Sequence, residues 1–151
     1  MRTRNNGIPK SPFGDKRRGE LAELAFTYRA ASLGFGVAKP YGESYHYDLL
    51  VQYGRQLHRI QVKSVFTTKH RGGGSGFAIV VCRHSYRGSI RYSREDIDFI
   101  AAFVAPHDAW YLIPVEALSD RQSIRLYPAG KKKTYGGYFE PYREAWHLLK
   151  G

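Results

Sequence analysis

The arrangement of apolar and polar residues predicts one helix near the start of the chain. Between 17 and 33, apolar residues recur at i, i+3, i+4 and i+7, the spacing of an amphipathic helix, at Leu21, Leu24, Ala25, Tyr28 and Ala31 or Ser32. Asp15 is a candidate N-cap, and Gly34 is the expected C′ residue because glycine tolerates the positive φ of that position. Glu20 and Glu23 lie off the apolar stripe.

Short apolar runs bounded by turn residues predict strands after this helix. They lie at 35–39, 99–105, 110–114 and 124–126, in addition to a hairpin at 47–64. The near-continuous apolar run 77–82 predicts a strand buried on both faces. Pro141 at a first helical position predicts a last helix, and Asp96 and Asp98 fit a turn before a strand. These elements indicate an α/β fold with a central mixed sheet and a helix at each end.

The hairpin at 47–64 carries polar groups on one face. Gly54 and Arg55 supply a two-residue loop, so that facing residues have numbers that sum to 109. In this register Asp48 lies opposite Gln61, and Lys63 shares their face because strand side chains alternate. The other face is apolar and should be buried; it holds Leu49, Val51, Ile60 and Val62.

The composition is that of one folded domain. The chain has 151 residues, of which 42% are hydrophobic and 15% aromatic. No apolar run approaches the roughly 20 residues that span a bilayer, so no membrane association is expected. The single cysteine, Cys82, excludes an internal disulfide framework and a multi-cysteine zinc site. We therefore expect a cytoplasmic protein with a flexible basic arm at 1–16 and one domain at 17–151.

The charge of the chain indicates a polyanionic partner. Lysine and arginine number 24 against 13 aspartate and glutamate, a net charge of +11. Binding of basic residues to phosphates releases counterions, which favours nucleic acid over a merely soluble basic protein. The arginines of 83–94 alternate with Tyr86 and Tyr92, which suits phosphate contact and base stacking, although a solvated loop is the alternative. The candidate nucleic-acid contacts are Arg17, Arg18, Lys69, Arg71, Arg83, Arg87, Arg91, Lys131, Lys132 and Lys133.

The polar face of the hairpin has the donors of a magnesium site. Mg²⁺ takes oxygen ligands and needs only one or two carboxylates besides water and substrate phosphate. Asp48 offers a carboxylate, Gln61 an amide oxygen and Val62 a backbone carbonyl, while a carboxylate from the first helix would complete the set. Lys63 would then reach the attacking water or the phosphate oxygens. An ordinary solvent-facing strand is the alternative interpretation of the same spacing.

Five segments together resemble a known family. They are GELAE (19–23), PYGESYHYDLLV (40–51), LHRIQVKS (57–64), EDIDFIAAF (95–103) and WYLIPV (110–115), and they resemble the PD-(D/E)XK nuclease superfamily. The similarity is greatest to the subgroup that includes group I intron homing endonucleases, and the first helix also resembles archaeal Holliday-junction resolvases. The resemblance implies a restriction-endonuclease-like core, a central mixed β-sheet flanked by helices.

The resemblance also implies roles for individual residues. Asp48 would be the central metal ligand, Gln61 and the Val62 carbonyl further ligands, and Lys63 the catalytic lysine. The helix acid would be Glu23, four residues after Gly19 as in the resolvase-like GxxxE pattern, with Glu20 as the alternative.

The sequence departs from the family at one ligand position. The commonest pattern has an acid where Gln61 stands, so a negative charge is missing, and Glu43 is a candidate to compensate for it. The homing subgroup is similar in using glutamine here.

The resemblance implies a Mg²⁺-dependent endonuclease, with Mn²⁺ as substitute, that hydrolyses phosphodiester bonds of double-stranded or branched DNA. A homodimer or higher homo-oligomer is expected, because one small site cuts one strand. Two alternatives stay open: a non-catalytic nucleic-acid-binding module with a degenerate nuclease fold, and an RNA-binding protein whose Tyr86 and Tyr92 stack on bases.

Overall fold

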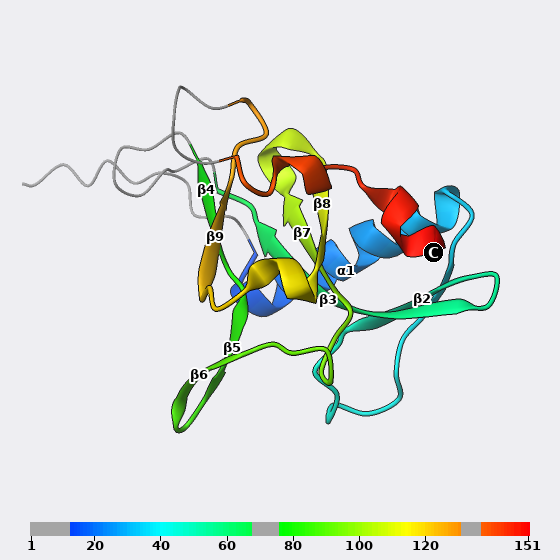
Figure 1. The fold of residues 1–151 in the computed structure, drawn as a ribbon, viewed down its shortest axis with the longest axis horizontal. Helices are drawn as coiled ribbons and strands as arrows, with labels where there is room; N and C mark the ends of the chain where they lie inside the picture. Colours follow the sequence, from blue (N-terminus) through cyan, green and yellow to red (C-terminus); the bar gives the residue numbers. More distant parts are fainter. Residues whose placement is uncertain (1–12, 68–75, 131–136) are drawn as a thin grey trace, which may run out of the picture.

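The computed structural model describes residues 13–67, 76–130 and 137–151 (Figure 1). Most of the predicted basic arm and five of the predicted nucleic-acid contacts, Lys69, Arg71, Lys131, Lys132 and Lys133, lie outside the described residues.

A five-stranded sheet forms the centre of the fold. Its strands are β1 (Gly36–Ala38), β2 (Leu49–Tyr53), β3 (Gln56–Val65), β7 (Phe99–Val104) and β8 (Ala109–Pro114), in the order β1-β2-β3-β7-β8. The β3–β7 pair is parallel and the other pairs are antiparallel, so the predicted mixed sheet is confirmed.

Smaller elements surround this sheet. β4 (Phe77–Val80) pairs with β9 (Ser123–Leu126), and β5 (Cys82–Ser85) pairs with β6 (Gly88–Arg91). Four short 3₁₀ helices complete the described chain: η2 (Ala105–His107), η3 (Val115–Leu118), η4 (Glu140–Tyr142) and η5 (Trp146–Lys150).

The helix α1 (Asp15–Ser32) covers one face of the sheet, but with a different side from the predicted one. Ala22, Phe26 and Ala30 are its buried residues, whereas the predicted stripe members Leu24 and Tyr28 are 62% and 77% exposed. Phe26 decides the orientation of the helix, because its ring packs against the indoles of two tryptophans from distant segments, Trp110 and Trp146. The two alanines leave room for the helix to approach the sheet.

One end of α1 differs from the prediction, and the other end agrees with it. Gly14 is the N-cap residue and Asp15 is already helical, so Asp15 does not cap the helix. At the other end Gly34 has φ 93°, as expected of a glycine that follows the last helical turn.

The predicted hairpin register is confirmed. Tyr53 pairs with Gln56 and Leu49 with Ile60, with Gly54 at φ 58° in the turn. The predicted apolar face of this hairpin is buried against α1.

Two other predictions are wrong. Run 77–82 is not one strand buried on both faces: Ala78 and Val80 are exposed, and Val81 separates β4 from β5. No α-helix follows Pro141 in the described 137–151 segment, which forms only η4 and η5.

Glu144 accounts for the absence of that last helix. It has φ 49°, and its carboxylate accepts hydrogen bonds from the Trp110 backbone N–H (3.0 Å) and the Trp146 indole N–H (2.6 Å). The segment therefore binds the edge of β8 between two short 3₁₀ helices instead of forming a continuous α-helix.

Candidate active site

The candidate site lies where β2 begins beside β3. The ladder of this pair ends at Leu49 and Ile60, and Asp48 precedes β2. Its N–H donates to the Ile60 carbonyl (2.8 Å), and its carboxylate accepts from the Val62 N–H (2.9 Å). The predicted register therefore stops one residue short of the Asp48–Gln61 pair. Asp48 bonds instead to Ile60 and Val62, the two neighbours of Gln61, and its carboxylate takes the place of a backbone acceptor for the Val62 N–H.

This arrangement leaves the Val62 carbonyl on the same edge as Asp48. The N–H and C=O of one residue in an antiparallel strand face the same neighbour, as a hydrogen-bonded pair shows by exchanging both bonds. Because the Val62 N–H points to Asp48, its carbonyl points to the same side.

Asp48 is half-buried and its charge is disfavoured. Burial, and to a smaller extent the charge of Glu23, raise the pKa of Asp48 to about 6 against the opposing effect of the Val62 hydrogen bond. Lys63 and Lys39 lower it. A carboxylate in this environment favours a nearby cation, which would remove both the burial cost and the repulsion between the two acids.

Lys63 projects from β3 near Asp48. Burial lowers the pKa of its ammonium, and the charge of Asp48 partly offsets that effect. The Lys63 Nζ lies 5.5 Å from the centre of the Tyr92 ring, a cation–π geometry. Burial also raises the pKa of the Tyr92 hydroxyl to about 12, so Tyr92 stays neutral at physiological pH.

The structure distinguishes the two helix acids. The charge of Glu23 acts on Asp48, and its carboxylate binds Lys39 Nζ at 3.0 Å. Glu20 lies one turn earlier on α1 and pairs with Arg17 at 3.3 Å. Both line a pocket between α1 and the start of the sheet, but Glu23 is the acid that acts electrostatically on Asp48.

The remaining predicted ligands, Gln61 and Glu43, lie in different parts of the structure. Gln61 lies on β3, pairs with Ile100 of β7 and is half-buried. Glu43 is an exposed residue of the loop before β2.

The donor set fits a metal ion only if uncharged oxygens take part. Among the described residues, no group of three or more histidine, cysteine, aspartate or glutamate side chains is placed to hold a metal ion. The predicted ligands are two carboxylates, the Gln61 amide and the Val62 carbonyl. These are all oxygen donors, as Mg²⁺ prefers.

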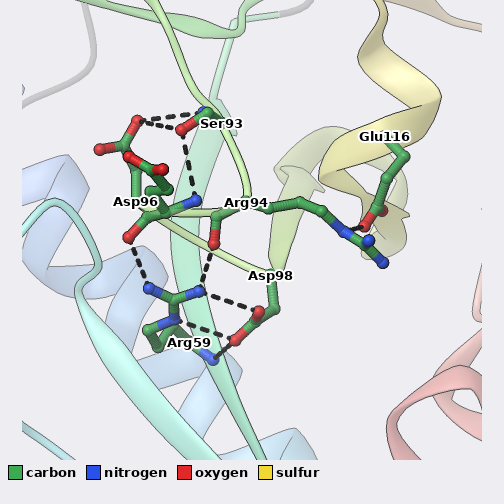
Figure 2. Close-up of polar contacts among 7 residues, drawn as sticks. Arg59, Ser93, Arg94, Asp96, Asp98 and Glu116 are labelled. Carbon is green, nitrogen blue, oxygen red and sulfur yellow. Dashed lines mark hydrogen bonds and ion pairs between the residues drawn. The ribbon is translucent and has the colours of Figure 1, made fainter.

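An arginine on β3 holds residues 94–98, which follow Tyr92 closely in the chain (Figure 2). The Arg59 guanidinium binds the Asp98 carboxylate at 3.1 Å through two nitrogens, and donates to the carbonyls of Glu95 (2.7 Å) and Arg94 (2.5 Å). The Arg59 N–H also donates to Asp98 (2.7 Å). Burial opposes the ionised form of Asp98, but these hydrogen bonds outweigh it and lower the pKa of Asp98.

Sequence reasoning missed three residues of this region. Lys39 shows only as a basic residue before Pro40, Arg59 only as one more basic position, and Tyr92 only as a candidate for base stacking. No local pattern marks Lys39 or Arg59. Lys39 binds Glu23, which is 16 residues away in sequence, and Arg59 binds Asp98, which is 39 residues away.

Five predicted nucleic-acid contacts lie within the described chain. Arg17 and Arg18 on α1 pair with Glu20 and Asp15 respectively. The other three, Arg83, Arg87 and Arg91, lie on the β5–β6 hairpin, where Arg91 Nε donates to the Asp120 carbonyl (2.7 Å). Within the described residues no helix is long and apolar enough to cross a membrane.

The mixed five-stranded sheet and the helix packed across it are those of the restriction-endonuclease-like class. A family model described as PD-(D/E)XK endonuclease matches residues 13–149. The chain belongs to this family, as its sequence motifs predict.

A homing endonuclease of known structure supports this assignment. The bacterial homing endonuclease I-Ssp6803I is 30% identical, with a TM-score of 0.72, and the match covers 91% of each chain. Hjc, a Holliday junction resolvase from the archaeal hyperthermophile Archaeoglobus fulgidus, is 16% identical with a TM-score of 0.48, covering 76% of this chain and 91% of Hjc. No curated protein sequence matches the chain.

Proposed function

We propose that this nuclease-family protein is a divalent-metal-dependent DNA endonuclease whose centre comprises Glu23, Asp48, Gln61 and Lys63. The observation that carries the proposal is the position of Asp48: it is held by the Val62 N–H, acted on by the charge of Glu23, and countered by Lys63. The similarity to a homing endonuclease supports DNA as the substrate.

The metal would be held by the carboxylates of Glu23 and Asp48, the Gln61 amide oxygen and the Val62 carbonyl. When bound, such an ion lowers the pKa of water and neutralises charge on the phosphate. Mg²⁺ is the expected ion and Mn²⁺ the expected substitute.

Backbone and side-chain groups of the protein would position the ligands and the reacting groups. The Val62 N–H fixes the direction of the Asp48 carboxylate, and Tyr92 fixes the ammonium of Lys63 from one side. Lys63 would donate a hydrogen bond to a phosphate oxygen or to the attacking water, and stabilise the charge that develops there. Lys39, which binds Glu23, would have to yield part of that carboxylate to the metal.

A plasmid-nicking assay tests the proposal. Supercoiled plasmid should be nicked with Mg²⁺ or Mn²⁺ but not with EDTA. Asp48→Asn and Lys63→Met keep the size of each side chain and should abolish nicking, while duplex binding measured by fluorescence anisotropy is retained. Substantial residual nicking by either variant contradicts the proposed centre.

Two further comparisons refine the site. Glu23→Gln should remove activity, and Glu20→Gln, one helical turn away, should leave most of it. Binding of DNA without cleavage under either metal would favour the alternative, a non-catalytic module. Cleavage of both strands would require two sites, so light scattering is expected to show a homodimer or a higher homo-oligomer.

A further inference from the structure

The β5–β6 hairpin is a two-stranded ribbon that projects from the body of the protein (Figure 1, green). Its strands pair only with each other among the described elements, from Cys82–Arg91 to Ser85–Gly88. All four residues of β6 are exposed, so no other described element covers that strand.

The tip of this ribbon is basic, aromatic and held in one shape. Tyr86 is 92% exposed, and the Arg87 guanidinium lies 5.3 Å from the centre of its ring. Ser85 Oγ accepts from the Arg87 N–H (3.2 Å) and donates to the Gly88 carbonyl (3.1 Å). Gly88 has φ 109°, which favours glycine. Because the turn is already ordered, binding through it would cost little conformational entropy.

The base of the ribbon lies beside the candidate active site. Tyr92 directly follows Arg91, the last residue of β6, and the Lys63 Nζ lies 5.5 Å from the centre of the Tyr92 ring. Arg91 itself is tied to the Asp120 carbonyl. The ribbon is therefore fixed at its base, close to the lysine, and free at its tip.

We propose that the β5–β6 ribbon enters the major groove of duplex DNA next to the cleavage site and reads base edges with Tyr86 and Arg87. This inference rests on the proposed function for its ligand. Four residues of strand extend about 13 Å, and the major groove is about 12 Å wide and 8.5 Å deep, so it admits a two-stranded ribbon. The minor groove, about 6 Å wide, is too narrow.

The charges of the ribbon fit this partner. Residues 82–91 contain three arginines and no carboxylate. Arginine forms paired hydrogen bonds with guanine in the major groove, and Tyr86 presents a ring and a hydroxyl at the same tip. A ribbon that bound phosphates alone would increase affinity without distinguishing sequences.

The test compares binding to two duplexes that differ only in the major groove. A 30-bp duplex pool of random sequence is prepared with cytosine or with glucosylated 5-hydroxymethylcytosine, whose sugar fills the major groove from the C5 position. Affinities are measured by fluorescence anisotropy in EDTA, where no cleavage occurs. The unaltered protein should bind the glucosylated pool about 10-fold more weakly, the scale of one lost base contact.

A matched pair of double variants assigns the effect. Tyr86→Ala with Arg87→Ala should bind the ordinary pool more weakly and lose the discrimination between pools. Tyr28→Ala with Arg55→Ala removes an exposed tyrosine of α1 and an exposed arginine of the β2–β3 turn, and it should keep the discrimination.

The inference is overturned if the unaltered protein binds both pools equally, or if the ribbon variant still discriminates as the control does. Failure of the proposed nuclease function has a different signature, which is absence of nicking by a protein that still discriminates between the pools.

Discussion

The half-buried carboxylate of Asp48 leads to a prediction about stability that is independent of any cleavage assay. Its pKa of about 6 compares with 3.8 for an ordinary aspartate, so keeping it ionised in the folded protein costs about 3 kcal/mol at neutral pH. Asp48→Asn removes the charge and keeps an oxygen for the Val62 N–H. In EDTA the variant should therefore be more stable than the unaltered protein by about 2 to 3 kcal/mol.

The titration of Asp48 also predicts how the stability of the protein changes with pH. Between pH 3.8 and about 6 the folded protein holds the Asp48 proton that the unfolded chain has released, so the stability of the unaltered protein falls as the pH rises through that window. The advantage of Asp48→Asn should be near zero below that window and complete above it.

Urea unfolding followed by tryptophan fluorescence measures this difference, because Trp110 and Trp146 are both buried. Glu95→Gln, which neutralises an exposed acid, should change little. Added Mg²⁺ should stabilise the unaltered protein and not the Asp48→Asn variant. An unaltered protein as stable as the variant at about pH 7.5 in EDTA, or a difference independent of pH, would refute the reasoning about this site.

Three other predictions concern the support of the site. Phe26→Ala should lower the free energy of urea unfolding by about 3 to 5 kcal/mol, because the ring is fully buried between two indoles. The exposed control Tyr28→Ala should change it by less than about 0.5 kcal/mol. Arg59→Lys should fail to hold residues 93–98, because lysine lacks the planar fork that binds Asp98, and hydrogen exchange should rise there by about 10-fold. Gln61→Glu should bind Mg²⁺ about 10-fold more tightly by calorimetry, because it adds a charged oxygen.

Each of these has a contradicting result. A small effect of Phe26→Ala would mean that α1 does not pack as described. Unchanged exchange in Arg59→Lys would mean that the guanidinium is not what holds the segment. Equal or weaker Mg²⁺ binding by Gln61→Glu would mean that position 61 is not a ligand.

The sequence alone determined the parts of this protein that depend on local spacing. The two-residue turn at Gly54 sets the hairpin register, and alternation then separates the buried face from the polar one. The register holds from Tyr53–Gln56 to Leu49–Ile60 without knowledge of the rest of the fold, because pairing in a short hairpin depends on the turn. Family motifs supplied the fold class and the identity of the candidate acids and lysine.

Tertiary packing decided the rest. Helical spacing predicts the wrong buried side for α1, because Leu24 and Tyr28 satisfy that spacing as well as Ala22, Phe26 and Ala30 do. Spacing cannot rank two faces when the deciding contacts, the tryptophans at 110 and 146, come from more than 80 residues away. The predicted C-terminal helix is absent for a similar reason, because Glu144 binds the edge of β8, which is distant in sequence.

The same distinction applies to the site. The charge of Glu23 rather than that of Glu20 acts on Asp48. The Lys63 ammonium lies over the Tyr92 ring, and Arg59 holds the residues that follow Tyr92. Each of these depends on residues that are far apart in sequence and adjacent only after folding. Local spacing identified the candidate side chains, and long-range packing determined their charge state, burial and direction, because those properties depend on the surroundings of a residue and not on the residue alone.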